Sequence, residues 1–103
     1  MEDIDKFQLG DTGVLFRVML LEDGLPVDLQ ACNDKHLIFK KPDGTTMVEE
    51  ADFYTDGTDG YIQYVVGSGY LDQTGLWKFQ GYAAFSSSSF HTNYENFLVL
   101  DNL

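Results

Sequence analysis

The chain has few cysteines, and this limits its chemistry. Its single cysteine, Cys32, cannot form an internal disulfide, so a disulfide-stapled secreted domain is excluded. We expect Cys32 to be a buried structural thiol, because a free cysteine packs like a small hydrophobic side chain. A catalytic cysteine would need a nearby base, and the spacing favours neither His36 nor His91.

Basic residues are also scarce. Six lysines and arginines stand against 17 aspartates and glutamates, which gives a net charge of −11. Binding to nucleic acid or to an anionic membrane surface is therefore not expected, because both need a basic footprint. The acidic charge favours solubility and repulsion between copies. The alternative interpretation is that it binds a basic partner or a divalent cation.

Long hydrophobic runs are missing as well. No apolar stretch approaches the roughly 20 residues of a membrane span. Residues 1–5 are acidic where a secretory signal would be basic. We expect synthesis in the cytoplasm without a signal peptide. We also expect an acidic flexible tail over residues 1–5, followed by a single domain over residues 6–103.

Turn signals between short alternating stretches dominate what is present. Glycine supplies a positive φ without steric cost, and aspartate accepts hydrogen bonds from its own backbone. Such turns occur at 22–24, 42–45, 56–60 and 67–69. Turns at this density predict an all-β domain of about seven or eight short strands, arranged as a predominantly antiparallel two-sheet β-sandwich. No apolar period of 3.6 residues is sustained, so no long helix is expected.

The strands follow from alternation and from β-branched or aromatic content. They are predicted at 6–9, 14–21, 35–41, 46–51, 61–66, 76–85 and 90–100. One helical turn is expected at 30–33, and a serine loop at 86–89 forms a hairpin tip. Trp77 shares one face of its strand with Phe79 and is the predicted centre of the core.

The turns and strands follow one another in a specific order: GDTG at 10–13, DGLPVDL at 23–29, FKKPDGT at 39–45, DGTDGYIQY at 56–64 and LDQTGLWK at 71–78. This order resembles the immunoglobulin-like domain at the N-terminus of bacteriophage baseplate upper proteins and of related small phage tail and virion proteins. The resemblance covers roughly residues 8 to 100. It implies an immunoglobulin-like sandwich.

The same resemblance implies a non-enzymatic structural or assembly role in the virion, in its tail or baseplate. The chain would contact other virion or tail proteins, either as an adaptor or as a small stand-alone component. It implies no catalytic residues and no cofactor. Self-association into a homo-oligomer remains open.

Five tyrosines are candidate interface residues, because tyrosine combines an apolar ring with a polar tip and is enriched at interfaces. They are Tyr54, Tyr61, Tyr70, Tyr82 and Tyr94. Exposed aromatic rings also stack on sugars, so a small carbohydrate-binding module is the alternative function.

Acidic residues offer weaker candidates. Asp52, Asp56 and Asp59 are the best calcium ligands in the chain, although aspartate in an Asp-Gly turn already has a structural role. Glu49 with Glu50, or Asp72 with Glu95, would serve a small hydrolase only if a cleft held the carboxylates about 5–10 Å apart. No metal is assigned. His36 is expected to be partly exposed on its strand.

His91 follows the serine loop and is expected to be solvated. The two histidines are not at metal-ligand spacing, so zinc is not expected.

Overall fold

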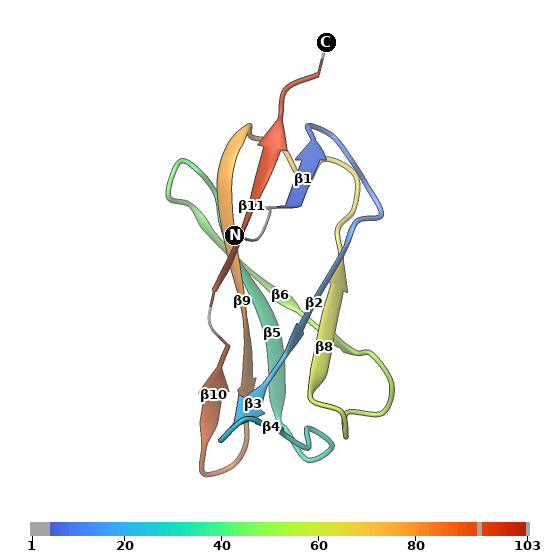
Figure 1. Ribbon diagram of the computed structural model, residues 1–103, viewed down its shortest axis with the longest axis vertical. Coiled ribbons are helices and arrows are strands. Elements are labelled where there is room, and N and C mark those ends of the chain that lie inside the picture. The colour runs from blue at the N-terminus through green and yellow to red at the C-terminus, as the bar shows by residue number, and fades with distance from the viewer. Residues whose placement is uncertain (1–4, 93, 103) are drawn as a thin grey trace.

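A computed structural model describes residues 5–92 and 94–102, and every regular element in these ranges is a β-strand (Figure 1). The strands are β1 (Asp5–Gln8), β2 (Leu15–Met19), β3 (Leu21–Glu22), β4 (Leu25–Pro26), β5 (Asp34–Lys40), β6 (Thr46–Glu50), β7 (Asp52–Phe53), β8 (Tyr61–Val65), β9 (Gly75–Ala84), β10 (Ser89–His91) and β11 (Glu95–Leu100). The all-β prediction is confirmed. Of the predicted acidic tail, Asp5 begins β1, and residues 1–4 lie outside the described ranges.

The strands form two main sheets. The larger sheet has the order β1-β11-β9-β5-β6, with β10 also paired to β9, and the smaller sheet has the order β2-β8-β7. β3 and β4 form a separate hairpin. Within the described residues, β1 pairs with β11 in parallel and the other pairs are antiparallel. The architecture is compatible with a β-sandwich, in which two sheets bury their facing side chains.

One segment connects the two sheets directly. β6 is an edge strand of the larger sheet, opposite β1, and β7 is an edge strand of the smaller sheet, opposite β2. Ala51 lies between them, fully buried, and its N–H donates to the Lys35 carbonyl at 3.0 Å. Figure 1 shows this part of the chain running diagonally across the molecule. The strand predicted over 46–51 did not include this change of sheet.

Two of the predicted turns are confirmed with their expected chemistry. In the β3–β4 hairpin, Asp23 has φ 53° and Gly24 has φ 79°, and a type I′ turn needs a positive φ at both of these positions. In the β5–β6 turn, the Gly44 N–H donates to the Lys41 carbonyl at 2.9 Å. This places Pro42 at the second turn position, which its fixed φ favours.

The prediction of one continuous strand over 90–100 is wrong. β10 and β11 both pair with β9, but His91 lies opposite Tyr82 whereas Glu95 lies opposite Phe79. The register against β9 therefore shifts by one residue between β10 and β11. Thr92 still continues the register of β10, because its hydroxyl accepts from the Gly81 N–H at 2.8 Å and its own N–H donates to the Gly81 carbonyl at 3.0 Å.

The helical turn expected at 30–33 is also wrong. The Cys32 N–H donates to the Leu29 carbonyl at 3.1 Å, which closes a single reverse turn without any helix. Cys32 is half-buried rather than buried, because the turn leaves it beside the core instead of between the sheets.

The core lies between the two sheets and is rich in aromatic rings. Trp77 is fully buried, as predicted; its ring stacks on Phe97 at 5.5 Å, and its Nε1–H donates to the Gln73 carbonyl at 2.9 Å. Phe16 reaches the larger sheet from β2. Its ring centroid lies within 5.5 Å of four others, those of Phe7, Phe39, Phe79 and Phe97.

Candidate functional site

The five tyrosines predicted as interface residues do not gather on one surface. Tyr54 and Tyr61 lie with the outer side chains of the smaller sheet, and Tyr82 and Tyr94 lie on the outer face of the larger sheet. Tyr70 is half-buried and packs against the core. The two outer faces are therefore separate candidate surfaces.

On the smaller sheet, the aromatic side chains form a cluster around a single cation. The Arg17 guanidinium lies 3.6 Å from the centre of the Tyr54 ring, and its Nε–H donates to Gln63 Oε1 at 3.0 Å. The rings of Tyr54 and Tyr61 are 5.7 Å apart at an angle of 81°. The charge of Arg17 is thus satisfied by its own neighbours, and the two rings do not form a flat platform.

On the larger sheet, Tyr82 lies between the two histidines of the chain. It pairs with His36 of β5 on one side and with His91 of β10 on the other. The His36 ring is nearly parallel to the Tyr82 ring, at 21° and 6.1 Å, and the His91 ring is 4.7 Å away. His36 is partly exposed and His91 is exposed, and both predictions are confirmed.

On the same outer face as these three rings, the larger sheet has a hollow of about 340 Å³, which we call the lysine groove. It is lined by Ile38, Lys40, Thr46, Lys78, Phe79, Gln80 and Tyr94. Lys40 of β5 and Lys78 of β9 are direct cross-strand partners. Tyr94 is 58% exposed, and its ring lies 4.8 Å from the Lys78 ammonium.

The lysine groove is positively charged, whereas the protein as a whole is negatively charged. The described lining residues include two lysines and no acidic side chain, in a chain with a net charge of −11. Like charges directly opposite each other on neighbouring strands are destabilising. A smaller hollow of about 200 Å³ also has Lys40 and Lys78 in its lining, together with Lys41. Half of the six basic residues of the chain thus meet in one region.

The lysine groove was not among the sites predicted from the sequence. Lys40 and Lys78 belong to strands that were both predicted, and alternation would have placed each on the face opposite the buried residues Phe39 and Trp77. Their juxtaposition depends on the register between β5 and β9, which alternation does not give. The sequence did contain one indication: four of the six basic residues lie in the two predicted strands at 35–41 and 76–85.

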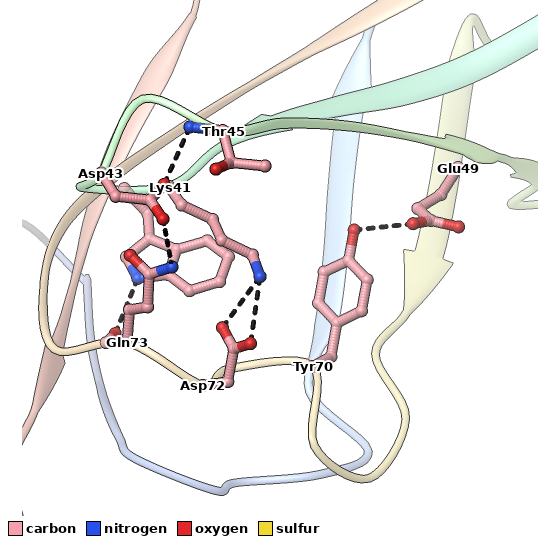
Figure 2. A network of polar contacts seen from close by, with 8 residues as sticks. Lys41, Asp43, Thr45, Glu49, Tyr70, Asp72 and Gln73 are labelled. Carbon is pink, nitrogen blue, oxygen red and sulfur yellow. Dashed lines mark hydrogen bonds and ion pairs between the residues drawn. The ribbon is translucent and has the colours of Figure 1, made fainter.

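Tyr70 lies at the rim of the core. Its hydroxyl donates to Glu49 Oε2 at 2.9 Å (Figure 2), and its ring packs against Phe39 at 5.4 Å. Burial, and then the hydrogen bond to Glu49, raise the pKa of Tyr70 above its ordinary value. Glu49 pairs across the strands with buried Leu37, whereas Glu50 pairs with His36 on the other face, so the two glutamates do not form a carboxylate pair.

A polar network joins the β5–β6 turn to the corner before β9 (Figure 2). The Lys41 ammonium lies 3.0 Å from the Asp72 carboxylate, and Gln73 Nε2 donates to Asp43 Oδ2 at 2.8 Å. Hydrogen bonds from Thr45 and Gln73 lower the pKa of Asp43. Asp72, which the sequence offered as a catalytic carboxylate, is thus an ion-pair partner in this network.

The acidic loop after β7 has a structural explanation. Asp56 Oδ1 accepts from the Thr58 hydroxyl at 2.6 Å and from the Thr58 N–H at 3.0 Å, and these bonds lower the pKa of Asp56. Asp59 Oδ1 accepts from the Tyr61 N–H at 3.1 Å. Over the ranges that the structure describes, Asp52 does not join these two residues in a group that could hold a metal ion.

The part of the chain that the structure describes has no helix with the length and apolar character needed to cross a membrane. No protein-family model matches the chain, and a search of curated proteins gives no match.

Proposed function

We propose that the protein is a non-enzymatic contact module with an immunoglobulin-like sandwich fold, and that it serves as a structural or assembly component of a bacteriophage virion, in the tail or baseplate. The resemblance in the order of turns and strands supports the virion role. The strand order and the exposed outer face of the larger sheet support the fold and the contact role.

The strand order supports the immunoglobulin-like assignment. In such domains strands B, E and D share one sheet, while C, F and G share the other, to which variable-type domains add C′. Here β2, β8 and β7 take the places of B, E and D, and β5, β9, β11 and β6 take those of C, F, G and C′. With a single cysteine in the chain, β2 and β9 approach each other through Val18 and Gly81 instead of a disulfide.

The observation that carries the contact role is the outer face of the larger sheet. Tyr94, Val48 and Leu76 on this face are 58%, 56% and 43% exposed, respectively. Exposed aromatic and large apolar side chains gathered on one face are typical of protein interaction sites. An assembly component would cover this face with a neighbouring subunit.

The virion role is tested on particles of the phage that encodes the chain. We expect mass spectrometry to detect this protein in gradient-purified virions at a fixed ratio to the tail proteins. Its absence from purified particles that contain all other tail proteins would refute the virion role. Light scattering over a concentration series then separates self-assembly, which gives a closed oligomer of defined mass, from assembly with a different chain.

One observation favours the carbohydrate-binding alternative. Tyr82 and His36 expose nearly parallel rings on the same outer face, and parallel rings suit sugar stacking. A glycan array decides between the two functions, because a sugar-binding module gives saturable hits that a Tyr82→Ala variant loses. A contact module of the virion gives none.

A further inference from the structure

We infer that the lysine groove binds a short acidic segment of a partner protein, with a carboxylate of that segment held between Lys40 and Lys78. This inference rests on the proposed contact role and specifies the surface and the chemistry of the partner.

Within the described residues, the two lysines of the groove lack an anionic partner. By contrast, Lys41 pairs with the Asp72 carboxylate, and Arg17 is held by Gln63 and Tyr54. The Lys78 ammonium contacts the Tyr94 ring at 4.8 Å, and this ring carries no net charge. Within residues 5–92 and 94–102, neither Lys40 nor Lys78 has a carboxylate within ion-pair distance. Two directly opposed lysines without an anion between them form a like-charge cross-strand pair, which lowers the stability of the isolated protein.

The register of β5 and β9 places the two lysines close enough to share one ligand. Directly opposed residues on antiparallel strands have Cβ atoms about 4.5–5.5 Å apart. The long side chains of Lys40 and Lys78 can therefore converge on the two oxygens of a single carboxylate, which accepts several hydrogen bonds. Ile38, whose side chain lies on the outer face between these strands, contributes apolar surface, which strengthens an ion pair by limiting its contact with water.

The charge of the whole chain limits the kind of anion that can bind in the groove. Outside the groove, a chain of net charge −11 repels a long polyanion, so a nucleic acid would gain at two lysines and lose elsewhere. A short segment with one or two carboxylates touches the groove alone. The exposed ring of Tyr94 at its edge offers a surface for an apolar or aromatic side chain of the same segment.

The test is a two-dimensional amide NMR titration of the full chain with the blocked peptide Gly-Glu-Tyr-Glu-Gly, and with Gly-Gln-Tyr-Gln-Gly as its neutral control. We expect saturable shifts at residues 38–40, 78–80 and 94 with the acidic peptide only, and weaker binding at higher salt. Equal binding of both peptides, or shifts confined to other regions, would overturn the inference.

Matched variants sharpen the test. Lys40→Gln and Lys78→Gln are each expected to weaken binding of the acidic peptide about tenfold, since each removes one charged hydrogen-bond donor. Lys35→Gln is the control: Lys35 is on β5 too, but its ammonium lies over the Phe53 ring, away from the groove. The same spectra report whether each variant is folded. Binding that survives in both groove variants would refute the site.

Two further outcomes separate other occupants. Saturable shifts at the groove with inorganic phosphate but not with the acidic peptide would overturn the choice of a carboxylate segment. Self-association that Lys40→Gln abolishes would identify a second copy of this chain as the occupant, in place of a different partner. Failure of peptide binding leaves the detection of the protein in virions unaffected, so the two proposals fail independently.

Discussion

The two faces of β9 differ sharply, although they alternate along the same ten residues. The inner face presents Trp77 and Gly81, both of which are buried. The outer face presents Lys78 and Tyr82, both partly exposed. Among the described residues, no polar or charged residue is buried in the core. The inner face is thus optimised for packing, whereas the outer face carries a like-charge pair that weakens the fold.

This difference between the two faces of β9 separates the residues that stabilise the fold from those that we propose contact a partner. The inner face sets a close fit between two sheets, and changes there act through packing. The outer face keeps an arrangement that folding alone does not favour, and such conflicts are typical of functional surfaces. Mutations should therefore have effects that become smaller, and finally change sign, from the inside to the outside.

The largest effect is expected for Trp77→Ala on the inner face. Removing the largest fully buried side chain leaves a cavity and an unpaired Gln73 carbonyl, and should cost ~3–5 kcal/mol of unfolding free energy. Urea unfolding followed by far-UV circular dichroism measures this. A loss smaller than that of Gly81→Ala would contradict the assignment of Trp77 to the centre of the core.

A smaller loss is expected for Gly81→Ala. An added Cβ would lie 2.5 Å from Val18 Cγ2 and 3.3 Å from Ile62 Cδ1, so the sheets would have to separate slightly. Overpacking of this kind costs ~1–3 kcal/mol. The double variant Gly81→Ala with Val18→Ala removes the clashing methyl groups. If the clash is the cause, the added cost of Gly81→Ala should be smaller in the Val18→Ala background than in the wild type.

The sequence predicted the features that local chemistry controls. The Asp23-Gly24 turn and the Pro42 turn follow from residues with special backbone preferences, and the burial of Trp77 follows from alternation along one strand. These features need no knowledge of distant partners.

Features that depend on pairing between distant segments were missed. The register shift between β10 and β11 is defined by their pairing with β9, and the sheet change at Ala51 is accompanied by a hydrogen bond to the distant Lys35 carbonyl. The tyrosines were assigned to one interface set because the sequence does not say which sheet each strand joins. The lysine groove, formed by the register of β5 and β9, belongs to the same class.

At the rim between the two faces, Tyr70→Phe should have an intermediate effect. The variant keeps the ring packing and loses the hydrogen bond to Glu49, at a cost of about 1 kcal/mol near neutral pH. Glu49 is partly exposed, so water replaces part of the interaction.

The pH dependence of Tyr70→Phe gives a second check. The pKa of Tyr70 is raised in the folded protein above its ordinary value of 10.0. Its contribution is therefore complete below about pH 10 and is lost as the pH rises toward the folded pKa, because only the unfolded chain then releases the proton. Urea midpoints at rising alkaline pH should fall more steeply for the wild type than for the variant. Equal slopes of urea midpoint against pH in the two proteins would contradict the burial of the Tyr70 hydroxyl. Tyr64, whose pKa is also raised, contributes to the slope in both proteins.

The smallest effects are expected on the outer faces, and they should have opposite signs. Lys40→Gln removes one of two facing ammonium groups, and should raise the unfolding free energy by about 0.2–0.5 kcal/mol. Arg17→Gln on the smaller sheet removes a cation that Tyr54 and Gln63 already satisfy, and should lower it by about 0.5–1 kcal/mol. Replicate urea melts at low salt resolve the signs, and added salt should shrink the gain in Lys40→Gln because it screens the repulsion in the wild type. If Lys40→Gln instead lowered the unfolding free energy as much as Arg17→Gln does, Lys40 would stabilise the folded protein. The two outer faces would then not differ in the way proposed.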